Sequence, residues 1–589
     1  MVDSRIMTDE QEVAFDESAV GEPEIEPDES SEQESEKEPD ESTEWEGEYG
    51  KAGCPIWMGE YHGDVRCGRE LHVAPDGVDE KPVCLMHSKD PQKQSGPLFD
   101  AFCSEFERIL GDAGQYLARF QRFVFPQLDL AGRYIEAICL FVEATFTRDA
   151  DFRKVTFTED AYFAGAIFTQ NANFCSATFT QSAVFDRSTF EHQVQFLEAT
   201  FAHEATFVET NFMEKVQFHN AIFTKKADFF GTRFKQIAVF FGATFNEGAS
   251  FHSGTFTQGA IFNVATFTQY ANFSMTAFGQ KADFMGATFT LGAIFERTKF
   301  DEEADWRECR FLGQANFRRT EFKSEDEETP SAVFSLAEFA TPEDVVFDRV
   351  DLSRTLFVNC DVSEFWFTSS VQWAKRKGNR GLAVFEEKIL LDPKFSEMQK
   401  RYGPIDHGAV EQIYHQLKKN YDARLDYRKA NEFHFGEMEM RRLEARNYSA
   451  FLKPWRWLRP WIGPEAWYLR ASDYGNSYVK PILWLFATLF MAAALFPISG
   501  LEIQLPKLEP ATTYQSAWNK QDTWTNNCWT EEKLFGNSFI AAVDSATFQR
   551  NPEYTPSYPW GRVLAIVETL LTSTLFGLFL LAIRRQFRR

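Results

Sequence analysis

The chain has 589 residues, enough for several domains. Phe accounts for 62 of them, more than a mixed globular core needs, and the formal net charge is −26. An acidic total of this size argues against general nucleic-acid binding, which needs a cationic face. The sequence contains no nucleophile–base set, phosphate-binding loop or open metal site that we can identify, so we predict no enzyme activity.

The negative charge is concentrated in residues 1–50. This segment holds 20 Asp or Glu and 2 Lys or Arg, a net charge of −18, and the other 539 residues share −8. It has too few apolar residues to offset the entropy of an ordered chain. We therefore predict a disordered acidic tail without a signal peptide, with docking to a basic partner as the alternative role.

A Cys/His segment over residues 51–98 follows the tail. The four candidate metal ligands are Cys54, Cys67, Cys84 and His87, and His62 is a substitute. Thiolate and imidazole groups close together in sequence suit tetrahedral zinc, and a short segment with little core of its own gains folding energy from a metal. We predict a structural zinc site here, since four protein ligands leave no open position; the alternative is a loop with scattered free cysteines.

Residues 99–138 carry apolar side chains at roughly helical spacing. Because a solenoid must cover its terminal faces, we predict a capping helix in this segment, directly before the repeat described next.

An aromatic residue recurs from Phe141 to Phe322 with a spacing that alternates between five and six positions. The series has 34 positions, of which 33 are Phe and one is Trp306. A small residue stands two places before each aromatic, and 22 of these small residues are Ala. On a helix these steps would scatter the aromatics around the axis, whereas in an extended chain positions two apart share a face. Each small residue and its aromatic therefore point inward together on a short strand.

A fixed period with short inward-facing strands predicts a β-solenoid over residues 139–373. Two 11-residue units, each built as 5+6, would form one four-sided coil of about 22 residues. The 34 positions then give about 8 coils and a rod of roughly 40 Å, at about 4.8 Å per coil.

The segments Ala-Asn-Phe-Cys-Ser, Ala-Thr-Phe-Thr-Gln and Ala-Asp-Phe-Met-Gly resemble the repeat unit of the pentapeptide-repeat family. The resemblance covers about residues 139–370 and implies a right-handed quadrilateral β-solenoid, mainly β in class. This chain departs from the family pattern by one extra residue in every second unit. Some family members mimic DNA, but residues 141–323 carry 21 acidic and 17 basic residues, too balanced for that role. We therefore favour a rigid scaffold.

Residues 380–450 are rich in helix formers with a break near Asp426, which predicts a helical hairpin packed on the solenoid end. A peptide-binding role for this hairpin is the alternative. Its faint likeness to a single tetratricopeptide unit adds little support.

The C-terminal part is predicted to enter a cell membrane. Trp and basic residues over 451–478 suit a membrane interface, and two apolar stretches are long enough to span a bilayer. We divide this part into an interfacial segment at 451–478, a first span at 479–501, an outer loop at 502–561, a second span at 562–584 and a basic end at 585–589. The flanking basic residues place both termini in the cytoplasm under the positive-inside rule.

The outer loop contains an apolar stretch at 534–548 that is expected to re-enter the membrane. Two helices around such a segment resemble the pore module of potassium-channel-like proteins. The place of the filter reads Thr547-Phe548-Gln549-Arg550, without the glycines that a potassium filter requires. Potassium selectivity is unsupported, and Thr547, Phe548 and Glu568 remain candidate pore residues.

These predictions combine into a membrane-anchored scaffold or sensor with a cytoplasmic solenoid and no catalysis. Its expected partners are the membrane, further copies of the chain and a protein that the sequence does not identify, with no nucleic acid. The alternative is an ion-channel-like protein with an oligomeric pore.

Overall fold

The computed structural model describes residues 53–58, 66–324, 326, 328–376, 381–448, 463–499, 501–503, 512–513, 532–547, 554–556 and 559–587. The predicted acidic tail, His62, Phe548, most of the predicted outer loop and part of the interfacial segment lie outside these residues.

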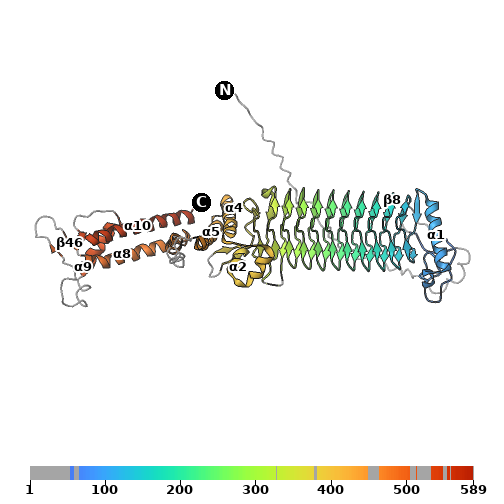
Figure 1. The fold of residues 1–589 in the computed structure, drawn as a ribbon, viewed down its shortest axis with the longest axis horizontal. Coiled ribbons are helices and arrows are strands. Elements are labelled where there is room, and N and C mark those ends of the chain that lie inside the picture. Colours follow the sequence, from blue (N-terminus) through green and yellow to red (C-terminus); the bar gives the residue numbers. More distant parts are fainter. Residues whose placement is uncertain are drawn as a thin grey trace, which may run out of the picture. The chain divides into compact units, whose positions relative to one another are not determined.

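A parallel β-solenoid occupies the centre of the chain (Figure 1). Its first turn contains β1 (Leu117–Arg119), β2 (Val124–Phe125), β3 (Leu128–Asp129) and β4 (Tyr134–Ile135), and its last strand is β43 (Trp366–Phe367). All strands between them are two or three residues long. They stack into four parallel sheets of 12, 10, 11 and 10 strands, which corresponds to about 11 turns.

The register of the sheets gives the length of one turn. Ala172 of β11 (Ala172–Asn173) pairs with Val194 of β15 (Val194–Gln195), and Phe168 pairs with Phe190. In both pairs the partner lies two 11-residue units further along the chain, which is the length expected for one coil. The charged insertion after Phe322 lengthens one turn, because Ala304 pairs with Ala332.

The core of the solenoid consists of aromatic ladders. Rings at equivalent positions in successive turns are parallel. The centroids of Phe163 and Phe185, for example, are 4.9 Å apart, with an angle of 2° between the ring planes. Rings from different sheets also meet edge to face, as in Phe152 and Phe163, whose centroids are 5.7 Å apart with an angle of 88° between the ring planes. Both arrangements are favoured by the ring quadrupole. The predicted inward direction of the Phe series is therefore confirmed.

The solenoid begins earlier than the Phe series indicates. Helix α1 (Pro97–Ala113) covers only the first part of the segment 99–138, which the sequence predicts as a capping helix. The remainder forms the first turn, in which Leu130 and Ile135 are buried at positions that Phe takes later. This added turn, together with irregular turns after Phe322, accounts for about 11 turns instead of about 8.

A helical subdomain follows the last turn. It contains α2 (Phe385–Leu391), α3 (Ser396–Tyr402), α4 (His407–Ala423) and α5 (Tyr427–Tyr448). The Asn420 side chain of α4 is buried and donates hydrogen bonds to the carbonyls of Val362 at 3.1 Å and Phe365 at 2.7 Å. The hairpin α4–α5 therefore closes the C-terminal end of the solenoid by satisfying backbone groups there.

The C-terminal part contains α7 (Pro464–Ser472), α8 (Val479–Ser499), α9 (Glu532–Ala546) and α10 (Pro559–Gln586). Short strands β46 (Leu501–Ile503), β47 (Thr512–Thr513) and β48 (Tyr554–Pro556) pair beside them. Helices α8 and α10 are long and apolar enough to cross a membrane, and α9 packs against both.

Candidate metal centre and membrane helices

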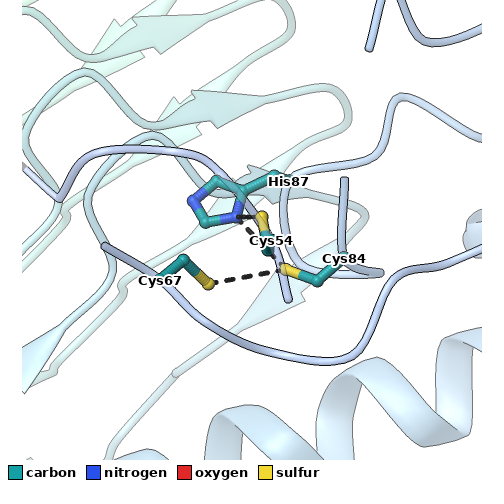
Figure 2. A group of neighbouring side chains, drawn as sticks. All are labelled: Cys54, Cys67, Cys84 and His87. Atoms are coloured by element: carbon teal, nitrogen blue, oxygen red, sulfur yellow. Dashed lines mark hydrogen bonds between the residues drawn. The ribbon is translucent and has the colours of Figure 1, made fainter. Parts of the chain in front are cut away.

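The four predicted metal ligands lie together in front of the solenoid's first turn (Figure 2). Cys54 and Cys67 come from the two arms of a hairpin, in which the Cys54 amide donates to the Arg69 carbonyl at 2.7 Å. Cys84 and His87 lie on a single tight turn, closed by the His87 amide on the Cys84 carbonyl at 3.0 Å. The C-x2-H spacing therefore places a thiol and an imidazole side by side.

The distances in this cluster fit tetrahedral coordination. The Nδ1 atom of His87 is 3.2 Å from Cys84 Sγ and 3.5 Å from Cys54 Sγ, and Cys67 Sγ is 3.7 Å from Cys84 Sγ. All four ligand atoms lie within 4.8 Å of one another. A zinc ion with Zn–S near 2.3 Å and Zn–N near 2.0 Å separates its ligand atoms by roughly 3.5–3.8 Å. The cluster could therefore hold a metal ion of this kind.

The solenoid and α1 fix the ligands from outside the cluster. The second ring nitrogen of His87 lies 3.2 Å from the Gln121 carbonyl, which points Nδ1 at the thiols. Arg69 donates to Cys67 Sγ at 3.2 Å and binds Glu105 of α1 at 2.8 Å. Such outer contacts orient metal ligands and balance thiolate charge.

Lys93 holds the turn that carries Cys84 and His87. Its buried ammonium donates to the carbonyls of Leu85 at 2.6 Å and Ser88 at 2.9 Å. Burial lowers the pKa of Lys93 to about 7. Arg69, Lys93 and Gln121 were not predicted from the sequence, because no motif links them to the ligands.

The electrostatics of the cluster favour the thiolate of Cys67, whereas hydrogen bonds with Cys54 and Cys67, together with burial, raise the pKa of Cys84. Hydrogen bonds from the Cys54 and Cys84 thiols hold the pKa of Cys67 below its ordinary value. Burial alone would lower the pKa of His87, but hydrogen bonds with Cys54 and Cys67 raise it to about 9. A metal cation that binds to these groups would displace the proton that they share.

The Cys/His segment is also hydrogen-bonded to the edge of the solenoid. The Val124 amide of β2 donates to the Met86 carbonyl at 2.8 Å, between Cys84 and His87. The ring of His87 meets Phe123 edge to face at 5.0 Å, and Phe106 of α1 stacks on Phe120 at 4.8 Å. The first turn is thus covered by the Cys/His segment and α1 together.

The candidate pore residues lie in different surroundings. Thr547 is exposed just after α9, and its hydroxyl donates to the Val543 carbonyl at 2.8 Å. Glu568 of α10 is 4% exposed, and neither of its carboxylate oxygens has a hydrogen-bond partner among the described residues. Nearby, the Ser545 hydroxyl of α9 donates to the Ala565 carbonyl of α10 at 3.0 Å.

Polar contacts link the hairpin to α10, one of the two candidate membrane helices. The Tyr474 hydroxyl lies after α7 and donates to Glu439 of α5 at 3.1 Å. Arg585, near the end of α10, donates to the Tyr474 carbonyl at 2.6 Å. A continuous series of contacts therefore runs from the last solenoid turn through α4 and α5 to α10.

Comparison with known protein families gives one partial match. A family model described as pentapeptide repeats (9 copies) matches residues 137–175, which include β5 (Ile138–Leu140) to β11. Comparisons with curated proteins and with solved structures give no match. The family match agrees with the solenoid and does not extend to the C-terminal helices.

Proposed function

We propose that the chain is a membrane-anchored scaffold, in which a right-handed pentapeptide-repeat solenoid on the cytoplasmic side is held at the membrane by α8 and α10. The observation that carries this proposal is the series of contacts from the solenoid to the membrane helices. Asn420 binds the last turn, and Arg585 of α10 binds the segment after α7. A rod fixed in this way presents its side faces to protein partners near the membrane.

The C-terminal basic residues support the cytoplasmic orientation. Arg584 and Arg585 follow the second span, and Lys480 stands at the start of the first. Positive residues gather on the cytoplasmic side of membrane helices. We accordingly place both termini in the cytoplasm.

We also propose that the Cys3His cluster binds structural zinc. The supporting observation is that three thiols and one imidazole meet within 4.8 Å beside the first solenoid turn. Zinc bound there would hold the Cys/His segment on the edge of β2, where backbone groups otherwise end unpaired. Four protein ligands fill a tetrahedral site, so we assign the metal a structural role and the chain no catalysis.

Alkaline carbonate extraction of membranes tests the anchor. We expect the full chain to stay in the membrane pellet, because two spans resist extraction. Release into the supernatant would show that α8 and α10 are core helices of a soluble protein and would overturn the proposal.

A second candidate function is an ion pathway through an oligomer. Glu568 favours it, because its carboxylate has no hydrogen-bond partner within the described ranges, and a buried carboxylate in an apolar helix is then costly unless a proton or cation accompanies it. Planar-bilayer recording of the purified chain decides this. Conductance that Glu568→Gln alters would favour the pathway, and a silent, monomeric protein would exclude it.

A further inference from the structure

A small pocket lies where the helical hairpin meets the end of α10. It has a volume of about 220 Å³ and is lined by Lys418 of α4, Asn431 and His434 of α5, Arg585 of α10, and Asp422. A second hollow of about 540 Å³ shares Lys418 and Asp422 with it. We call the first of these the junction pocket.

His434 is a buried polar group in this pocket that lacks one partner. Its side chain is 6% exposed, and its Nδ1 atom lies 3.1 Å from Glu437 Oε2. Its Nε2 atom has no hydrogen-bond partner among the described residues. A buried ring nitrogen left in this state costs free energy, so it indicates a ligand that is present when the pocket is filled.

One carboxylate, that of Glu437, is shared by three side chains beside the pocket. This carboxylate accepts from Lys418 at 3.0 Å and contacts both His415 and His434. Asp422 is the other carboxylate at this pocket, and Lys419 adds a further positive charge to the adjoining hollow.

Arg585 adds a cation with no acidic partner in the described part of the chain. Among the described residues its guanidinium donates to a neutral group, the Tyr474 carbonyl, at 2.6 Å. Gly475 lies directly beside it, and a Cβ at that position would be 3.0 Å from Arg585 Nη1. Burial first, and the charges of Arg585 and Lys418 in addition, lower the pKa of His434. These groups thus converge on a volume that an anion would fill favourably.

We propose that the junction pocket binds a phosphate group, held by Lys418, His434 and Arg585. The guanidinium suits a phosphate oxygen, because its planar donors bind such oxygens in charge-assisted pairs. His434 takes up a proton when the phosphate binds, because two anions then face its ring: Nδ1 donates to Glu437 and Nε2 donates to a second phosphate oxygen. The phosphate comes either from a lipid headgroup, since α10 is a candidate membrane helix, or from a soluble phosphate compound.

Binding to the full chain in phospholipid-free detergent micelles tests this site. Two probes distinguish the sources: inorganic phosphate and short-chain phosphatidic acid, with short-chain phosphatidylcholine as the zwitterionic reference. Saturable binding of phosphatidic acid alone assigns a lipid headgroup. Saturable binding of both phosphate probes assigns a soluble phosphate. Absence of saturable binding for both would overturn the proposal.

Two arginine variants on the same helix turn provide the matched control. Arg585→Gln should weaken binding of the phosphate probe by about tenfold, because it removes a charge-assisted contact. Arg584→Gln removes the same charge from an exposed neighbour that does not line the pocket, and should change affinity by less than about twofold.

Equal losses in the two arginine variants would show diffuse attraction to a basic surface and contradict the site. His434→Asn gives a second readout, with an expected loss of about tenfold. If His434→Asn does not fold, the comparison of the two arginine variants decides alone.

Discussion

The solenoid and the Cys/His segment in front of it are stabilised in opposite ways. In the regular turns of the solenoid the same aromatic contacts repeat, so Phe196 stacks on Phe174 and on Phe218 with centroid distances of 4.8 Å in both pairs. The Cys/His segment instead gathers four candidate metal ligands in a single cluster that does not repeat along the chain. Loss of one side chain should therefore be local in the solenoid and global in the Cys/His segment.

The largest expected effect is the loss of a metal ligand. Cys84→Ser should remove bound zinc and expose residues 66–94 to protease, because zinc coordination supplies folding free energy of about 10 kcal/mol. Zinc content measured by mass spectrometry should fall from one equivalent to none. Cys103→Ser, which changes a half-buried thiol of α1 outside the cluster, should keep the metal. Zinc retained in Cys84→Ser would contradict the ligand assignment.

The second prediction concerns one ring of a ladder. Phe218→Ala should lower the free energy of unfolding by about 3–5 kcal/mol, because it opens a cavity that the neighbouring turns cannot fill. Denaturant unfolding followed by circular dichroism measures the change. Phe241→Ala is the control, since this ring is 44% exposed at a corner of the solenoid. Its change should stay within about 0.5 kcal/mol, as for most surface substitutions. Similar losses in both variants would argue against ladder packing.

The third prediction examines the closed end of the solenoid. Burial raises the pKa of Glu386 to about 7, and its carboxylate accepts from the Phe357 amide. The folded state holds this proton more tightly than the unfolded state, in which the pKa of Glu is near 4.3. The resulting stability is fully present below that pH and is lost as the pH rises through the folded-state pKa of about 7. The melting temperature of the wild type should fall between pH 5 and pH 8, by an amount equivalent to about 3 kcal/mol.

Glu386→Gln should remove most of this pH dependence, because the amide oxygen still accepts from Phe357 and no longer titrates. Glu397→Gln, at an exposed position of α3, should leave the dependence unchanged. An unaltered pH dependence in Glu386→Gln would assign the titration to another group.

The smallest expected effect comes from a close backbone approach between turns. A Cβ at Gly313 would lie 1.9 Å from the Leu291 carbonyl oxygen, so Gly313→Ala must shift the backbone and should cost about 1–3 kcal/mol. A Cβ atom added at Gly111 of α1 has no neighbouring atom within 4 Å. Gly111→Ala should therefore stabilise the helix by about 0.5–1 kcal/mol. Thermal melting measures both. A neutral Gly313→Ala would mean that successive turns can move apart.

The solenoid was predictable because its signal repeats. The alternating five and six spacing of Phe, with Ala two places before, fixes the inward face of each strand at many positions at once. The first turn was missed because Leu130 and Ile135 replace Phe there, so a search for aromatics alone begins too late. A large aliphatic side chain also fills such a buried position, so the core does not require Phe there.

In the candidate metal centre, only the four candidate ligands were predictable from the sequence. The short spacing between Cys84 and His87 is typical of a metal site. The spacing between Cys54 and Cys67 is wider and less specific, and these two side chains meet because their hairpin arms pair. The supporting contacts of Arg69 and Lys93 depend on α1 and on backbone carbonyls, which carry no residue-specific signal. The two candidate membrane helices were predictable from hydropathy, but the burial of Glu568 depends on packing between helices.

The membrane anchor with a cytoplasmic solenoid is tested most directly by thiol labelling in sealed right-side-out vesicles. A membrane-impermeant maleimide should modify Cys528, in the segment between the two spans, and should modify an Ile237→Cys variant on the solenoid surface only after the vesicles are permeabilised. Labelling of Ile237→Cys in sealed vesicles would place the solenoid on the other side of the membrane and contradict the proposed function.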